Sequence, residues 1–327
     1  MNRRFIALSA IAVASFVVTT ATGNGSTLIR LLTSAAAPTL YVSEYDHSDA
    51  IILRGSHESI IQGPRTKLNE PISIAREPSG DLVLVDPTIR RQKIPGSIVT
   101  VPPRAGDPKA KYVISCSSSA FFGVTVDASS NIWATEDNKT AIEVYASNAD
   151  GCAKPLFSIR GKKTGLIAPT GIAIDSQGRI IVENWYPNSG VEVFAPGSKG
   201  NVAPIAVITG SATGIDHPEG LTVDAHDNIW VTNYGALSNP ARIMEFPPNA
   251  NGNVAPERVI HGPNTQLQAT VGIAIGQKTG KIYVTNGGTS SSQLGGVLVF
   301  ARNASGDAAP LEELVPHTFP TGVVVNE

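Results

Sequence analysis

The sequence is poor in charge, in cysteine and in long apolar runs. Only 16% of its 327 residues are charged, and the formal net charge is −2. The longest basic cluster is Arg90-Arg91-Gln92-Lys93, so no basic stripe is present that would attract a nucleic acid. No nucleophile elbow, glycine-rich phosphate loop or cysteine/histidine zinc spacing occurs either. We therefore expect no nucleic-acid partner, and none of these motifs points to an activity.

The one long apolar run lies at the N-terminus and has the pattern of an export signal. Arg3 and Arg4 precede an apolar stretch at residues 5–18, and small residues follow it. We expect residues 1–21 to be a signal peptide cleaved between 21 and 37, with 22–37 as a flexible linker and 38–327 as one domain. The stretch is short for a membrane-spanning helix, and no second one follows, although an uncleaved anchor is the alternative. The mature protein is then secreted or periplasmic and has no membrane span.

An internal repeat of about 50 residues runs through the rest of the chain. Its clearest copies lie at residues 169–184 and 218–233, and weaker copies begin at Pro71, Phe121 and Thr270. A glycine marks each copy, replaced once by serine, at six positions spaced 48 to 52 residues apart: Ser73, Gly123, Gly171, Gly220, Gly272 and Gly322. Because a repeat of this length is one supersecondary unit, it decides the fold class.

Within each unit the apolar residues alternate with period two, which is typical of β-strands. Ile172 and Ile174 are followed by Ile180 and Val182, with turn residues between the two pairs. No helical stripe follows the N-terminal run. The pattern predicts an all-β fold, a six-bladed β-propeller with four-stranded antiparallel blades. The last copy stops after its first strand, so we expect the N-terminal segment 38–44 to complete that blade and close the ring.

The repeat also resembles a known family. The pattern Pro-x-Gly-Ile-Ala-Ile-Asp, followed by Gly-x-Ile-x-Val-x-Asn, is similar to the repeat of NHL-type propellers, whose wider group includes gluconolactonase-like and peptidyl-hydroxyglycine lyase propellers. The segments at 200–204, 252–256 and 306–310 resemble those of secreted bacterial NHL-like proteins. The resemblance covers nearly the whole mature chain and implies the propeller fold. It leaves the chemistry open, because a fold does not fix a function.

Six polar residues end the predicted second strands, at the mouth of the central channel. The loops before the first strand and after the second share one face, which we name the upper face. Three neighbouring blades present carboxylates there and the other three present amides: Glu44, Asp86, Glu136, Asn184, Asn233 and Asn286. Oxygen ligands of this kind suit calcium, so Glu44, Asp86 and Glu136 form a candidate divalent-cation site. The alternative is local, since Asp and Asn side chains at strand ends also cap turns.

Aromatic and histidine residues follow in the loops of the upper face. Tyr45, Trp185 and Tyr234 come directly after the polar ring, and Tyr186 follows Trp185. Such rings suit a sugar or a small organic ligand, although covering the blade tops is the alternative. Four histidines also map to upper loops, and two map to the lower face: His47, His217, His261 and His317, then His57 and His226. We expect these histidines to be scattered rather than to form a zinc site.

The enzymes in the wider propeller group provide a test, because several of their metal ligands lie in or next to the slot before the repeat glycine. The six residues directly before the repeat glycine are Ile72, Phe122, Thr170, Glu219, Val271 and Thr321. One of them, Glu219, has an ionisable side chain. Only Glu219 could bind a metal there. The resemblance therefore does not carry over either catalytic site.

The two cysteines give opposite signals. An exported protein favours a disulfide between Cys116 and Cys152. In the repeat, however, Cys116 aligns with Gly210 at the upper end of a fourth strand, and Cys152 aligns with Asn201 in a loop assigned to the lower face. A disulfide needs Cα atoms within about 7 Å, and a blade is roughly 15 Å tall. We therefore expect two free thiols.

The sequence favours a binding module without evident catalysis, which takes a small-molecule or protein partner on its upper face. The alternative is a metal-dependent lactonase- or lyase-type enzyme that uses Glu44, Asp86 and Glu136, together with Glu219 and one histidine of the upper face. A structural role in the cell envelope is a third possibility. No cofactor is required by the sequence, and the one candidate is a divalent cation, calcium.

Overall fold

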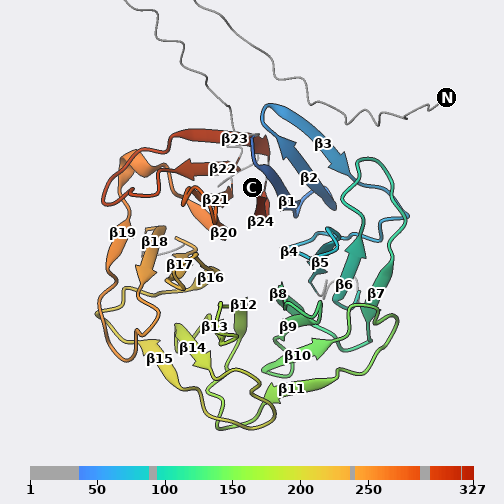
Figure 1. Cartoon of the computed structure of the whole chain (residues 1–327), viewed down its shortest axis with the longest axis horizontal. Helices are drawn as coiled ribbons and strands as arrows, with labels where there is room; N and C mark the ends of the chain where they lie inside the picture. Colours follow the sequence, from blue (N-terminus) through green and yellow to red (C-terminus); the bar gives the residue numbers. More distant parts are fainter. Residues whose placement is uncertain (1–36, 88–93, 236–239, 288–294, 318) are drawn as a thin grey trace, which may run out of the picture. The chain divides into compact units, whose positions relative to one another are not determined.

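Six four-stranded sheets form the blades of a ring in the computed structural model of the chain (Figure 1). The described residues are 37–87, 94–235, 240–287, 295–317 and 319–327, so the expected signal peptide and residues 22–36 of the expected linker lie outside them. In these ranges the one helix is the 3-10 turn η1 (Pro263–Thr265). The predicted all-β propeller with six antiparallel blades is confirmed. No helix among the described residues is long and apolar enough to cross a membrane.

The blades follow the sequence, with the innermost strand first. Blade 1 has β4 (Ser73–Arg76), β5 (Leu82–Asp86), β6 (Ser97–Val101) and β7 (Tyr112–Ser115). Blade 2 has β8 (Phe121–Val126), β9 (Ile132–Glu136), β10 (Ala141–Tyr145) and β11 (Phe157–Arg160). Blade 3 has β12 (Pro169–Ile174), β13 (Ile180–Asn184), β14 (Gly190–Phe194) and β15 (Ala206–Thr209).

The remaining three blades complete the circle. Blade 4 has β16 (Pro218–Val223), β17 (Ile229–Asn233), β18 (Arg242–Phe246) and β19 (Arg258–Ile260). Blade 5 has β20 (Ala269–Ile275), β21 (Ile282–Gly287), β22 (Gly295–Phe300) and β23 (Glu312–His317). Blade 6 has β24 (Pro320–Asn326), β1 (Thr39–Glu44), β2 (Asp49–Arg54) and β3 (His57–Ile61).

The ring closes as predicted, with both ends of the domain in one blade. The last strand, β24, pairs antiparallel with β1, and Val42 lies opposite Val323 in this register (Figure 1). Runs of consecutive buried residues, as in β5 and β13, place buried side chains on both faces of a sheet, because successive side chains point to opposite faces. Each blade can therefore pack against both of its neighbours. Between blades 3 and 4, for example, the buried cluster includes Ile181, Val231 and Phe246. Burial of these faces holds the blades in place around the channel.

The repeat glycine lies where neighbouring innermost strands approach most closely. A Cβ atom on Gly123 would lie 2.3 Å from the carbonyl oxygen of Thr170 in the next blade. The hydroxyl of Thr135 accepts the N–H of Gly123 at 2.7 Å and donates to the same Thr170 carbonyl, also at 2.7 Å. Thr285 makes the equivalent pair of bonds between blades 5 and 6. The glycine and the hydroxyl together join adjacent blades at the channel wall.

Substitution of Gly123 by alanine should therefore destabilise the ring. The new methyl group would overlap the Thr170 carbonyl, and overpacking of this kind costs about 1–3 kcal/mol. The matched control is Ser73→Ala, because Ser73 already carries a Cβ at the same repeat position and loses only the bond from the Val124 N–H. Urea unfolding should rank Gly123→Ala clearly below Ser73→Ala. Equal stability of the two variants would contradict this account of the channel wall.

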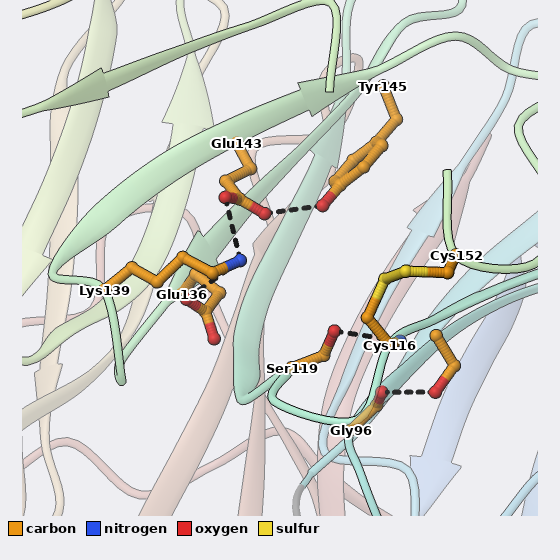
Figure 2. The surroundings of a disulfide bond; sticks show 9 residues. Gly96, Cys116, Ser119, Glu136, Lys139, Glu143, Tyr145 and Cys152 are labelled. Carbon is orange, nitrogen blue, oxygen red and sulfur yellow. Dashed lines mark hydrogen bonds and ion pairs between the residues drawn. A yellow bond between two sulfur atoms is a disulfide. The ribbon is translucent and has the colours of Figure 1, made fainter. Parts of the chain in front are cut away.

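The expectation of two free thiols is wrong. Cys116 and Cys152 form a disulfide, and their Cα atoms are 4.8 Å apart (Figure 2). The alignment with Gly210 and Asn201 holds, but the loop before the fourth strand does not stay on the lower face. It runs upward along the outermost strand of the preceding blade, where Ile114 and Gly151 form a parallel bridge. This path brings Cys152 to the upper end of β7.

Other neighbouring blades are joined at the equivalent positions by a hydrogen bond in place of the disulfide. At the position of Cys116 these interfaces have a glycine, and at the position of Cys152 they have an Asn or Asp. The Oδ1 atom of that Asn or Asp accepts a backbone N–H just after the glycine, as from Lys163 to Asn201 at 2.8 Å. The four pairs are Gly63 with Asp107, Gly161 with Asn201, Gly210 with Asn253, and Gly262 with Asp307. The disulfide thus replaces a repeated polar contact between blades.

Candidate functional site

All six residues of the predicted polar ring are buried and bind the loop that precedes the innermost strand. The amide of Asn184 accepts the N–H of Ile167 at 3.0 Å and donates to the carbonyl of Gly165 at 2.9 Å. Asn233 and Asn286 make the same two kinds of bond. The carboxylates occupy the same place, each accepting one backbone N–H at 2.7 to 3.0 Å: Glu44 from Phe319, Asp86 from Asn69, and Glu136 from Ala120. The contacts are those of the local capping alternative.

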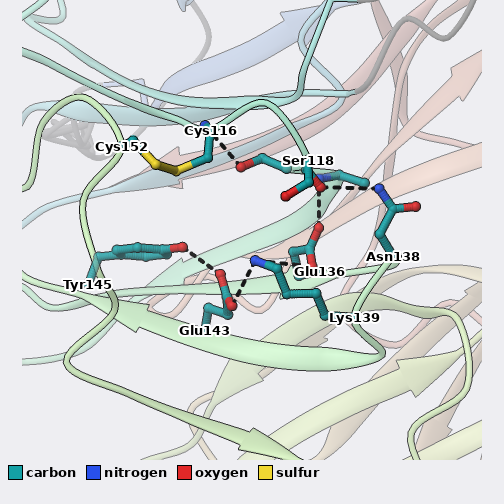
Figure 3. A network of polar contacts seen from close by, with 10 residues as sticks. Cys116, Ser118, Glu136, Asn138, Lys139, Glu143, Tyr145 and Cys152 are labelled. Carbon is teal, nitrogen blue, oxygen red and sulfur yellow. Dashed lines mark hydrogen bonds and ion pairs between the residues drawn. A yellow bond between two sulfur atoms is a disulfide. The ribbon is translucent and has the colours of Figure 1, made fainter.

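The three carboxylates of this ring differ in their second contacts. The other oxygen of Asp86 accepts the hydroxyl of Ser97 at 2.9 Å, and burial raises the pKa of Asp86 to about 7. Glu136 lies 3.6 Å from Lys139, which also binds Glu143 (Figure 3). Among the described residues, no group of three His, Cys, Asp or Glu side chains is arranged to hold a metal ion. A calcium role for Glu44, Asp86 and Glu136 stays a prediction. Each of these carboxylates already accepts a hydrogen bond from a backbone N–H.

The predicted aromatic residues divide between two parts of the upper face. Tyr45 packs edge-on against Phe319, with ring centroids 6.1 Å apart, and burial followed by the charge of Glu70 raises its pKa. Trp185 instead packs edge-on against His217, with ring centroids 5.1 Å apart, and Tyr186 stacks on that imidazole at 5.4 Å. The imidazole Nδ1 lies 2.8 Å from Asp216. We name Trp185, Tyr186 and His217 the aromatic platform.

The platform is exposed, whereas the other tryptophans are not. Tyr186 is 57% exposed and Trp185 is 38% exposed, and both belong to the few large apolar side chains that face solvent. His47, His57, His226 and His261 lie in other parts of the structure, and the side chain of His317 lies outside the described part of the chain. Of the predicted histidines, the one that joins an aromatic cluster is His217. Aromatic side chains are common in the binding sites of small organic ligands.

Glu219 lies at a bulge in the innermost strand of blade 4. In the pairing of β16 with β17, Pro218 lies opposite Asn233 and Gly220 lies opposite Thr232, so Glu219 has no partner across the ladder. Bulges of this kind redirect a side chain. Glu219 lines a cavity of about 70 Å³ in the central channel, together with apolar residues and glycines of all six innermost strands. Among the described residues that line this cavity, Glu219 is the one with an ionisable side chain.

A second carboxyl group, that of Glu183 in blade 3, lies near enough to Glu219 for the charge of Glu219 to raise its pKa. Four other blades have a hydroxyl residue at the equivalent position: Ser43, Thr135, Thr232 and Thr285. Glu183 is fully buried, and its Oε2 atom lies 3.5 Å from the Thr170 hydroxyl. Its Oε1 atom has no hydrogen-bond partner in the described structure. The repeat hydroxyl that joins blades elsewhere is thus replaced by a carboxyl group between blades 3 and 4.

The two carboxyl groups strongly favour their neutral forms. Burial raises the pKa of Glu219 to about 8. Burial and then the neighbouring charge of Glu219 raise the pKa of Glu183 well above its usual range. Burial and the same carboxylate raise the pKa of Tyr234, which places this predicted aromatic residue beside Glu219. Carboxyl groups with raised pKa values in a channel are characteristic of functional sites, although ion networks also produce them.

The sequence analysis therefore found part of this site. It named Trp185 and Tyr234 as candidate ligand residues and Glu219 as the one ionisable residue before a repeat glycine, whereas it expected His217 to be one of several scattered histidines. It missed Glu183, although the signal was present, because Glu183 replaces the Ser or Thr that four other repeats have directly before the polar ring. A departure from a repeat that adds a buried charge is a better guide to a site than the polar residues that every repeat shares.

Comparisons with known proteins support the fold. No protein-family model matches the chain, and no curated protein is significantly similar to it in sequence. A protein of unknown function from Bacteroides caccae superposes with a TM-score of 0.66 and 13% identity, over 89% of this chain and 100% of that one. A protein from Lactobacillus plantarum gives a TM-score of 0.58 and 13% identity, over 90% and 100% of the two chains.

A streptogramin B lyase is also similar, with a TM-score of 0.51 and 16% identity, over 75% of this chain and 72% of that one. Identities this low show the fold alone, because one fold hosts many functions. The chain is thus a six-bladed β-propeller with four-stranded blades. Its function has to be argued from the site.

Proposed function

We propose that this protein is an extracytoplasmic propeller of the NHL-like type that binds a small ligand on its upper face. The binding site consists of the aromatic platform, Tyr234 and the Glu183–Glu219 pair, all from blades 3 and 4. The observation that carries the proposal is an exposed aromatic cluster around His217, which precedes Glu219 by two residues in the chain; Glu219 is the one ionisable side chain among the described residues that line the channel cavity. Aromatic area beside a few polar groups is what a small organic ligand requires.

Two features support a location outside the cytoplasm. Residues 1–21 have the pattern of a signal peptide, and the domain carries a disulfide. Disulfides persist in oxidising compartments and are rare in the reducing cytosol. A secreted or periplasmic binding module therefore fits both the N-terminal sequence and the cysteine pair.

Intrinsic fluorescence can test the binding site directly. Trp133 and Trp230 are 6% and 2% exposed, so a ligand at the platform should change mainly the emission of Trp185. We expect a saturable change with at least one of four probes: glucose, N-acetylglucosamine, hexylamine and benzoate. The double variant Trp185→Ala/Tyr186→Ala should abolish both the emission change and the ligand-induced rise in melting temperature.

The control variant is Leu311→Ala, which removes an apolar side chain of similar exposure (55%) from a loop of blade 5. It should bind as the wild type does. The proposal is overturned if none of the four probes gives a saturable response, or if the double variant responds like the wild type. Trp185→Phe separates the signal from binding, since it should lose the emission change and keep the thermal shift.

A further inference from the structure

The Glu183–Glu219 pair has acceptor atoms and no cation. Neither glutamate forms an ion pair with a described lysine, arginine or histidine. The Oε1 atom of Glu183 is buried without a hydrogen-bond partner, and the side chain is 0% exposed. A buried acceptor left unpaired costs free energy, and a buried carboxylate requires a positive partner. At the blade 3–4 interface the Oε1 atom of Glu183 therefore lacks a hydrogen-bond partner, and an ionised Glu183 would also lack a positive one.

Other interfaces show what this position normally does. Where a threonine stands, as at Thr135 and Thr285, one hydroxyl both accepts the glycine N–H and donates to the next blade. An ionised Glu183 can only accept. When Glu183 is ionised, the hydroxyl donor of the other blades is replaced by an acceptor, and the buried Oε1 atom can accept a hydrogen bond from an external donor.

The size and the lining of the cavity select the kind of donor. Its volume of about 70 Å³ compares with roughly 30 Å³ for one water molecule in the liquid. A primary ammonium group is compact and has three donors and one charge, whereas a trimethylated one is larger and has no donor. Calcium takes 6 to 8 oxygen ligands, and only two carboxyl groups meet here. Tyr234 adds an aromatic ring next to Glu219, and aromatic rings also attract cations.

We infer that Glu183 and Glu219 bind the primary ammonium group of an organic amine, with the apolar part of the amine directed toward Tyr234 and the aromatic platform. This inference rests on the proposed function, because it names the chemical class of the same ligand. The proton that the pair holds is displaced by the ammonium charge. The titratable groups that interact with Glu219 are Glu183 on β13 and Tyr234 after β17. Affinity for an amine should therefore rise between pH 6 and pH 8.5, as the pair loses its proton while the amine keeps its charge.

Three matched probes test the inference by calorimetry on the mature protein. Hexylamine should bind, hexanol should bind at least tenfold more weakly because it has no charge, and hexyltrimethylammonium should also bind at least tenfold more weakly because its head group has no N–H donor. Proton release should appear as a heat that depends on the ionisation enthalpy of the buffer. Glu219→Gln and Glu183→Thr should each weaken hexylamine at least tenfold, and the exposed control Glu313→Gln should not.

The outcomes separate this inference from the proposed function. If hexylamine and hexanol bind equally, or if Glu219→Gln binds hexylamine as the wild type does, the ammonium assignment is wrong. The platform then remains a binding site as long as Trp185→Ala/Tyr186→Ala still abolishes binding. A rise in melting temperature with calcium chloride that Glu219→Gln removes, without any response to hexylamine, would overturn the assignment in favour of a metal. Circular dichroism of Glu183→Thr excludes misfolding as the cause of lost binding.

Discussion

The double variant Cys116→Ser/Cys152→Ser should be less stable than the wild-type protein by about 4 kcal/mol. The disulfide closes a loop across a sequence separation of 36 residues, and the chain-entropy model gives about this value for such a loop. The bond also ties the loop after β7, the outermost strand of blade 1, to the loop before β11, the outermost strand of blade 2 (Figure 2). Urea unfolding of the oxidised wild type, the reduced wild type and the variant measures the effect. The reduced wild type should behave as the variant does.

The repeat supplies a matched variant for the same prediction. Cys116→Gly/Cys152→Asn introduces the glycine and asparagine that join blades 2 and 3 and blades 3 and 4. The new amide should accept one backbone N–H and recover about 1 kcal/mol relative to the serine variant. Recovery should be partial because Cys116 lacks the positive φ of the four glycines, which lies between 117° and 129°. Equal stability of the two double variants would show that the polar contact contributes nothing, and a fully stable serine variant would contradict the disulfide's role.

The fold followed from the sequence because every repeat repeats the same physical constraints. Period-two apolar residues, a glycine that permits close approach and a polar residue at each strand end recur in all or nearly all units, so errors in one copy are corrected by the others. The closing blade was predicted for the same reason, since a strand missing at residue 327 had to be supplied by residues 39–44. Structural features that recur in every repeat are the ones that the sequence predicts best.

The disulfide was mispredicted because strand order does not give the path of a loop. The assignment of Cys152 to the lower face assumed that the loop before the fourth strand stays where it begins. Five parallel bridges, such as Ile208 with Gly252, instead carry this loop up the neighbouring blade. The Gly and Asn/Asp residues that recur at matching positions in neighbouring repeats were a readable signal, and their pairing would have placed the two cysteines together.

The candidate site was predicted in part for a different reason. We chose the polar ring as a candidate site because a polar residue recurs at the end of each second strand. In the structure these residues accept a backbone N–H from the loop before the innermost strand, which is a structural role. Glu183 occurs once, and the cost of its burial becomes visible only when Glu219 is placed opposite it. Sequence patterns reveal what blades share, whereas the site depends on where blade 3 and blade 4 differ from the rest.

Glu183→Thr should stabilise the protein, and the gain should grow with pH. The variant restores the residue that blades 2, 4 and 5 have, so its hydroxyl can accept the Gly171 N–H and donate across to blade 4. Glu183 is ionised in the unfolded chain above about pH 4.3 but stays neutral in the folded protein, because burial raises its pKa well above that value. A raised carboxyl pKa favours folding below the unfolded pKa and loses this advantage as pH rises toward the folded one. Each pH unit in that window costs the wild type about 1.4 kcal/mol relative to the variant.

Melting temperatures of the wild type and Glu183→Thr between pH 5 and pH 8 measure this difference. The wild type should lose stability over this range, since Asp86, Glu192 and Glu219 also have raised pKa values of about 7, 8 and 8. These groups remain in the variant, so the difference between the two curves reports Glu183 together with its interaction with Glu219. A difference that does not widen with pH would mean that Glu183 is already charged in the folded state. A stabilised variant that no longer binds hexylamine would show that the wild type retains an unfavourable buried carboxyl group because binding requires it, as expected where activity and stability compete.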